Sequence, residues 1–177
     1  MTPEIEGTVP IRSSVSAFIA AMRERVATGL LTNPRARYVV CGADATGIEV
    51  RAVDWRTAID IGLNQIELSQ GEPGSIHYRV RYWRWASYVI GLSGAIGVVG
   101  VALMLGFDVR DYIERHQASR IPGLSTEQNL LILWVMIAFW GFVWPWVLIA
   151  VHKGPLRRLV TSIITDVDAR GLARRSS

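Results

Sequence analysis

Cysteine is almost absent from this chain of 177 residues, which contains Cys41 alone. One thiol cannot close an internal disulfide or build a thiol-rich metal cage, so the composition implies neither an oxidising compartment nor a zinc site. Cys41 stands among apolar residues of a predicted strand and has no neighbouring histidine that would activate it. We therefore expect a buried, inert thiol in a reduced compartment.

Residue patterns for catalysis and metal binding are also lacking. The three histidines, His77, His116 and His152, fall in three separate regions of the chain, which argues against a shared metal site. An acidic cluster lies in residues 108–116, but the arginines interspersed with it favour a solvated helix over a cation site. The cluster consists of Asp108, Asp111, Glu114 and His116. The sequence predicts no catalytic residue, no metal and no cofactor.

Charge is absent from two long apolar runs, residues 85–107 and 130–151. An α-helix rises about 1.5 Å per residue, so each run can cross a hydrocarbon core of about 30 Å. The N-terminal segment has neither a basic n-region nor a long apolar core, and we expect no cleavable signal peptide. The sequence thus predicts a two-pass membrane protein with an outer loop at residues 108–129.

Lysine is scarce as well, since Lys153 is the only lysine among 19 basic residues. This arginine bias favours a GC-rich bacterial genome. Basic residues gather on the two flanks that should share one side of the membrane, whereas the loop 108–129 mixes arginines with acids. These flanking residues are Arg79, Arg81, Arg84, Lys153, Arg157 and Arg158. The positive-inside rule then predicts an inner-membrane protein with both termini in the cytoplasm.

The first 84 residues form the one segment large enough for a small soluble domain. Apolar residues at helical spacing predict a helix over 15–26, and a hairpin is predicted from strands at 38–41 and 48–53. A third strand is expected at 59–68, despite Gly62 and Asn64, and the alternation over 75–84 predicts a fourth. The expected fold is α+β, one helix on a four-stranded antiparallel sheet, with a small curled barrel as the alternative.

Small residues recur along the first apolar run at Gly91, Gly94, Gly97 and Gly100. They allow close approach by another helix, and packing against the second run is favoured over oligomerisation. Interfacial tryptophans are expected at both flanks, and Pro145 predicts a kink near the end of the second run. The predicted membrane anchors are Trp83, Trp85, Trp144 and Trp146.

The tail, residues 153–177, contains an apolar stripe at helical spacing. Pro155 suits the first position of an amphipathic helix, and Gly171 suits its end. Two placements have equal weight, either flat on the inner leaflet or packed on the soluble domain or a partner. Asp166 and Asp168 oppose tight membrane contact at the end of this helix.

Arginines on one face of the fourth predicted strand and in the tail are candidates for contact with an anion or a lipid headgroup. They are Arg79, Arg81, Arg84, Arg157 and Arg158. An exposed sheet face close to lipid headgroups is favoured over a soluble-ligand site. Acidic residues are interspersed and no recognition fold is signalled, so we predict no nucleic-acid partner.

The leading hypothesis is a non-enzymatic inner-membrane protein whose small cytoplasmic domain serves as an interaction or accessory module. Its expected partners are membrane lipid and either a second copy or another membrane protein. The alternative is a ligand-gated sensor that binds an anionic small molecule and oligomerises through the glycine-rich helix 85–107. An enzyme acting on a lipid-linked substrate ranks third, because no nucleophile and base are paired in sequence.

Overall fold

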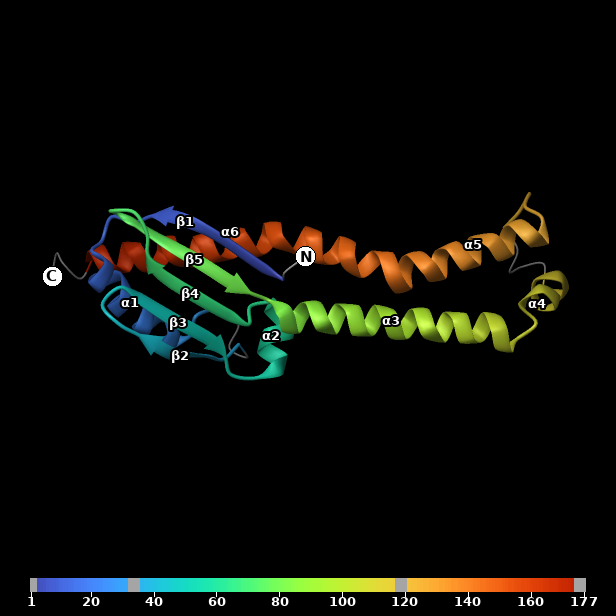
Figure 1. Ribbon diagram of the computed structural model, residues 1–177, viewed down its shortest axis with the longest axis horizontal. Coiled ribbons are helices and arrows are strands. Elements are labelled where there is room, and N and C mark those ends of the chain that lie inside the picture. Colours follow the sequence, from blue (N-terminus) through green and yellow to red (C-terminus); the bar gives the residue numbers. More distant parts are fainter. Residues whose placement is uncertain (1–2, 32–35, 117–120, 174–177) are drawn as a thin grey trace. The chain divides into compact units, whose positions relative to one another are not determined.

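The computed structural model describes residues 3–31, 36–116 and 121–173 and contains two compact units (Figure 1). The first, here called the sheet domain, comprises Met1–Ser87 and Val151–Ser177. The second, here called the helical hairpin, comprises Tyr88–Ala150. The C-terminal segment therefore belongs to the sheet domain, although the whole hairpin separates the two in sequence.

An antiparallel sheet of five strands, in the order β1-β5-β4-β3-β2, forms the sheet domain. The strands are β1 Glu4–Pro10, β2 Tyr38–Ala43, β3 Gly47–Ala52, β4 Gln65–Gln70 and β5 Ser75–Arg81. The predicted helix and antiparallel sheet are present, but the sequence reading missed β1. This strand pairs along β5 from Glu4 opposite Arg81 to Pro10 opposite Ser75, and it forms one edge of the sheet.

The predicted strand over 59–68 is wrong in its first half. Residues Trp55–Ile61 form a short helix, α2, in which the Asp54 side chain caps the N-terminus by accepting from the Thr57 N–H at 2.7 Å. Gly62 ends the helix with φ +76°, a left-handed conformation that glycine adopts without a Cβ penalty. Glycine and asparagine therefore separate α2 from β4, and no bulged strand is needed.

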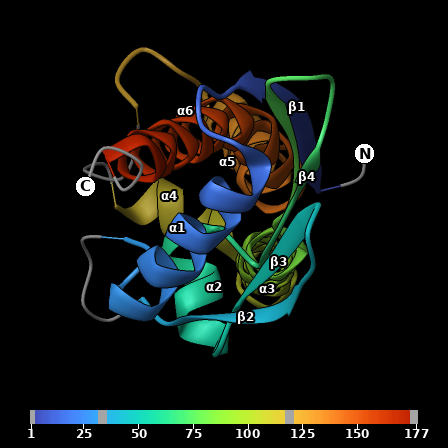
Figure 2. The ribbon, with the colours of Figure 1, turned by 90° about the vertical axis from the view of Figure 1, so that its left-hand side faces the viewer.

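One face of the sheet is covered by α1 (Val15–Thr28) and by the C-terminal part of α6 (Trp144–Ala173) (Figure 2). Phe18 and Met22 of α1 are fully buried, as are Val50 and Val80 of the sheet. From α6, the residues that are at most 2% exposed are Leu156, Val160, Ile164 and Val167. At about 1.5–3 kcal/mol for each large side chain removed from water, this burial is a major part of the domain's stability.

The C-terminal amphipathic helix thus packs on the domain, which decides between the two placements that the sequence allowed. Its predicted limits are wrong. Pro155 lies inside the continuous α6, and Gly171 does not end the helix, which continues to Ala173. A Cβ on Gly171 would lie 3.3 Å from the Ser13 side chain, so this glycine allows α6 to pack closely against the segment before α1. Packing against the sheet domain stabilises the helix, which therefore continues past Pro155 and Gly171, although local sequence patterns mark both residues as helix boundaries.

Asp168 joins the end of α6 to the segment before α1. Its carboxylate accepts hydrogen bonds from the Arg12 N–H, at 3.0 Å, and from the Ser13 N–H and hydroxyl, at 2.9 and 2.6 Å. Burial alone would raise the pKa of Asp168, but these hydrogen bonds outweigh it and lower the pKa below its ordinary value. The residue therefore ties together two segments that are distant in sequence, with little of its surface exposed.

Within the described part of the chain, two helices are long and apolar enough to cross a membrane, Trp83–Gly106 (α3) and Thr126–Ala173. The second runs through α5 (Thr126–Ala138), a π-helical turn at Phe139–Val143 and α6. Pro145 has no N–H for the carbonyl four residues earlier, and the wider turn lies where that hydrogen bond is missing. The irregularity occurs where the sequence predicted a kink.

Within the hairpin, glycines bring the two long helices into backbone contact. A Cβ on Gly97 would lie 2.9 Å from the Gly141 Cα, and a Cβ on Gly100 would lie 3.0 Å from the Ile137 side chain. Gly91 and Gly94, in contrast, would have no heavy atom of the described residues within 4 Å of an added Cβ. The four glycines therefore divide into two that serve this hairpin and two whose surroundings are open.

Candidate functional site

The outer face of the sheet carries a network of paired charges. The Arg79 guanidinium lies 3.4 Å from a Glu4 carboxylate oxygen and 3.5 Å from one of Glu6. Arg81 lies 3.5 Å from oxygens of both Glu4 and Glu67. An anion would have to compete with these carboxylates for either arginine. Anion contact by Arg79 and Arg81 stays a prediction, and this geometry does not favour it.

Arg84 lies in an aromatic environment at the start of α3. Its guanidinium carbon is 5.6 Å from the ring centroid of Trp55 and 5.5 Å from that of Trp83, within the range of cation–π attraction. The two indoles meet edge to face at 6.0 Å and are each almost half exposed. The sequence predicted Trp83 and Arg84 as interface residues but gave Trp55 no role, because α2 was read as part of a strand.

The two chain segments that lead into and out of the hairpin meet through a ring stack. The imidazole of His152 stacks on the indole of Trp85 at 3.9 Å and 15°, and the Tyr82 ring lies at 5.6 Å from the imidazole. Gly62 contacts His152 so closely that a Cβ would overlap the imidazole. The predicted anchor Trp85 thus fastens the start of α3 to α6 within the sheet domain.

The predicted anchors of the second run lie in the hairpin. The Trp144 ring lies 4.8 Å from that of Trp140 and 5.8 Å from that of Phe139. Trp146 is half exposed. The rings of Phe139, Trp140 and Trp144 therefore cluster around the π-helical turn, just before Pro145.

A groove lies between the edge strand β1 and α6, lined by Glu4, Ile5, Glu6, Lys153, Gly154 and Arg157. We call it the β1–α6 groove. Lys153 and Arg157 are one helical turn apart on α6 and so share a face. The Arg157 guanidinium donates to the Glu6 main-chain carbonyl at 3.5 Å, a long hydrogen bond. Sequence reasoning placed these basic residues beside the membrane but could not find the strand opposite them.

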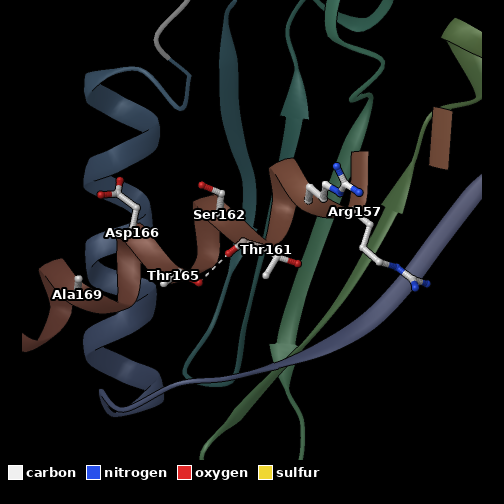
Figure 3. A pocket seen from close by; sticks show the side chains of 7 residues that line it. Arg157, Thr161, Ser162, Thr165, Asp166 and Ala169 are labelled. Carbon is white, nitrogen blue, oxygen red and sulfur yellow. Dashed lines mark hydrogen bonds between the residues drawn. The ribbon is translucent and has the colours of Figure 1, made fainter. Parts of the chain in front are cut away.

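A second, more open groove follows on the outer surface of α6 (Figure 3). Thr161 and Thr165 lie on successive turns there, and the Thr165 hydroxyl donates to the Thr161 carbonyl at 2.9 Å. Asp166, at the far end, pairs with Arg25 of α1 at 3.4 Å and with Arg170 at 3.1 Å. The lining residues are Arg157, Arg158, Thr161, Ser162, Thr165, Asp166 and Ala169. Arg157 contributes to both grooves, and Arg158 faces this one.

The acidic cluster after the first apolar run forms the short helix α4 (Val109–Arg115). Asp108 caps its N-terminus through the Asp111 N–H, at 2.9 Å, and Asp111 pairs with Arg115 at 2.8 Å. Arg110 pairs with Glu114 at 3.6 Å. Among the described residues no group of three or more potential ligands could hold a metal ion. The charges pair with one another, as in the solvated helix that the sequence favoured.

Cys41 corrects a sequence prediction, because the structure places this residue at the surface. It belongs to β2, an edge strand, in which the register with β3 shifts between Val40 and Gly42. The apolar neighbours predicted burial, but Val39 and Val40 are themselves 46% and 36% exposed. Local sequence gives no sign that a strand lies at the edge of a sheet.

Comparison with protein-family models, with curated proteins and with solved structures finds no match to this chain.

Proposed function

We propose that this protein is a two-pass membrane protein whose sheet domain serves as an interaction or accessory module at the membrane surface. The proposal includes an inner-membrane location with both termini in the cytoplasm. Its expected contacts are membrane lipid and a membrane-protein partner or a second copy. The basic flanks of the two apolar runs support this orientation.

Exposure of the apolar helices supports membrane insertion. In their most apolar stretches, 11% of the first helix and 17% of the second are buried. Large side chains such as Ile96 and Val98 are about 60% exposed, at 57% and 63%. A core helix of a soluble protein would be mostly buried, and α3 begins far from the N-terminus, unlike a signal sequence. Lipid is the medium in which such a surface is stable.

The observation that carries the proposal is that α6 belongs to both units. The helix enters from the apolar hairpin and completes the core of the sheet domain with Leu156, Val160 and Ile164. The C-terminal part of α6 is therefore an integral part of the sheet domain and is continuous with the hairpin, so a partner of the sheet domain would be held at the membrane.

Cross-linking in native membranes, followed by mass spectrometry of the purified protein, tests this function. We expect the protein to resist alkaline carbonate extraction and to be recovered with a stoichiometric partner or as a homo-oligomer. Release into the soluble fraction would contradict the membrane location. Recovery of a free monomer from cross-linked membranes would contradict the interaction role.

The alternative, a ligand-gated sensor, receives less support from the described residues. Arg79 and Arg81, which it needs for the anion, each contact two carboxylates. Gly97 and Gly100, which it needs for assembly, pack on the second helix of the same hairpin. Gly91 and Gly94 are left for an oligomer contact, so assembly through α3 would use the half of the helix nearer the sheet domain.

A further inference from the structure

We infer that the β1–α6 groove is a binding site for the phosphate group of an anionic phospholipid, held by Lys153 and Arg157. This inference rests on the proposed membrane location. It goes beyond it by assigning one ligand chemistry to one groove, and by separating Arg157 from its neighbour Arg158.

Lys153 and Arg157 both lack an acidic partner within the part of the chain that the structure describes. Lys153 is half-buried, and no carboxylate of the described residues lies within ion-pair distance of it or of Arg157. The Arg157 guanidinium has a long hydrogen bond to a main-chain carbonyl and retains further N–H donors. A partly desolvated ammonium beside a guanidinium favours an anion, and a phosphate accepts from both.

The second step concerns the two acids that also line the groove. The carboxylates of Glu4 and Glu6 lie within 3.5 Å of Arg79, and Glu4 also pairs with Arg81. Arg79 and Arg81 therefore offset part of this negative charge on the outer face of the sheet, although Arg81 is shared with Glu67. The buried Ile5 lies between them in β1, with its side chain on the inner face. The groove thus presents uncompensated positive charge from α6, although two acids line it.

Gly154 leaves space in the β1–α6 groove. A Cβ added to Gly154 would have no heavy atom of the described residues within 4 Å, although this residue lines the groove between Lys153 and Arg157. The missing side chain leaves the groove open on the helix side. Gly154 lies inside α6 without a positive φ, so no backbone requirement explains a glycine here. A small residue at this position keeps the groove open for a ligand, which a long side chain would fill.

The fourth step selects a lipid over a free phosphate. Lys153 follows the last residue of the uncharged run 130–151 by two positions, so chain connectivity places it at the end of the predicted span. Phospholipid phosphates lie at that depth, and basic residues there gain from the anionic surface. Arg158, one residue further, lines the other groove and offers a control of equal charge.

The full-length protein in nanodiscs of mixed phosphatidylglycerol and phosphatidylcholine provides the test. The readout is the enrichment of phosphatidylglycerol among lipids retained by the purified protein, measured by native mass spectrometry. We expect Lys153→Gln and Arg157→Gln each to lower this enrichment about fivefold. Gly154→Leu, which fills the groove without changing charge, should lower it as much, whereas Gly154→Ala and Arg158→Gln should change it less than about twofold.

Two results would overturn the inference. One is an equal effect of Arg157→Gln and Arg158→Gln with none from Gly154→Leu, which would mean a general attraction of basic charge. The other is displacement of phosphatidylglycerol by millimolar inorganic phosphate, which would make the site one for a free anion. Unchanged thermal unfolding of each variant verifies folding. Failure to enter nanodiscs would instead contradict the proposed membrane location.

Discussion

The helix α6 is one continuous element, but the exposure of its apolar side chains differs between its first part and its last part. In its first part Trp146 and Val151 are 50% and 64% exposed, whereas in its last part Leu156 and Val160 are at most 2% exposed. The backbone geometry is the same in both, so the difference lies in what surrounds the helix. The sheet covers the last part, whereas the exposed apolar side chains of the first part would be stable in the membrane that we propose.

The largest expected effect comes from a substitution in the part of α6 that the sheet covers. Ile164→Ala removes a fully buried side chain and leaves a cavity, so we expect a loss of about 2–5 kcal/mol in the stability of the sheet domain. Val151→Ala, at a position that is 64% exposed, is the matched control and should leave the domain unchanged. Thermal and denaturant unfolding in detergent measure the stability of both variants. Equal destabilisation by the two substitutions would contradict the difference between the covered and the exposed part of α6.

A slightly smaller effect is expected at the tie between α6 and α1. Asp168→Ala leaves the buried N–H of Ser13 without an acceptor, and we expect a cost of about 2–3 kcal/mol. Since folding lowers the pKa of Asp168, its contribution is complete above the ordinary carboxyl pKa and is lost as the pH falls through the lowered folded value. Denaturation between neutral and acidic pH should therefore show a weaker acid dependence in Asp168→Asn than in the natural chain.

The hairpin offers a third comparison within a single helix. Gly97→Leu forces a side chain against the backbone of Gly141, and we expect about 1–3 kcal/mol of destabilisation. Gly94→Leu, where the space is open, should leave the hairpin intact. Thermal aggregation in detergent reports both changes. Loss of a homo-oligomer in Gly94→Leu, with unchanged thermal stability, would reveal assembly through the open part of α3.

The smallest effect is expected at Tyr82, whose ring lies beside those of Trp85 and His152. The Tyr82 side chain is fully buried, but its hydroxyl has no hydrogen-bond partner among the described residues. Tyr82→Phe keeps the ring and removes an unsatisfied group, so stability should change by less than about 1 kcal/mol or increase. A clear loss in thermal unfolding would mean that the hydroxyl has a partner.

Local sequence patterns predicted most of the elements but missed β1, which depends on a distant partner, and α2, whose local signals were outweighed. The helix at 15–26 and most of the strands at 48–53 and 75–84 follow from periodicity, and both apolar runs follow from their length and lack of charge. The last predicted strand was too long, because β5 ends at Arg81 and α3 begins at Trp83. The signals for α2 were present in Asp54 and Gly62, which cap it at both ends, but its isoleucines suggested a strand. The edge strand β1 contains charged residues whose partners lie more than 70 positions away in β5.

The candidate groove was only half visible in the sequence. Arg157 was identified as basic and close to a predicted span, but its neighbour in space, Glu6, is 151 residues away. Nothing local separates Arg157 from Arg158, although only Arg157 also lines the β1–α6 groove. The pairing of Arg79 and Arg81 with Glu4 also depends on β1, so the sequence could not show that these two arginines are engaged.

The central claim is that the two apolar helices cross a membrane and leave the sheet domain on the cytoplasmic side. The exposed Cys41, the only cysteine of the chain, allows a direct measurement with a membrane-impermeant maleimide on intact and lysed cells. A second protein carries Cys41→Ser and Arg115→Cys, with the new thiol in the predicted outer loop. We predict that Cys41 is labelled after lysis only and that the loop cysteine is labelled in intact cells. Labelling of Cys41 in intact cells, or labelling of the two sites under identical conditions, would contradict the account.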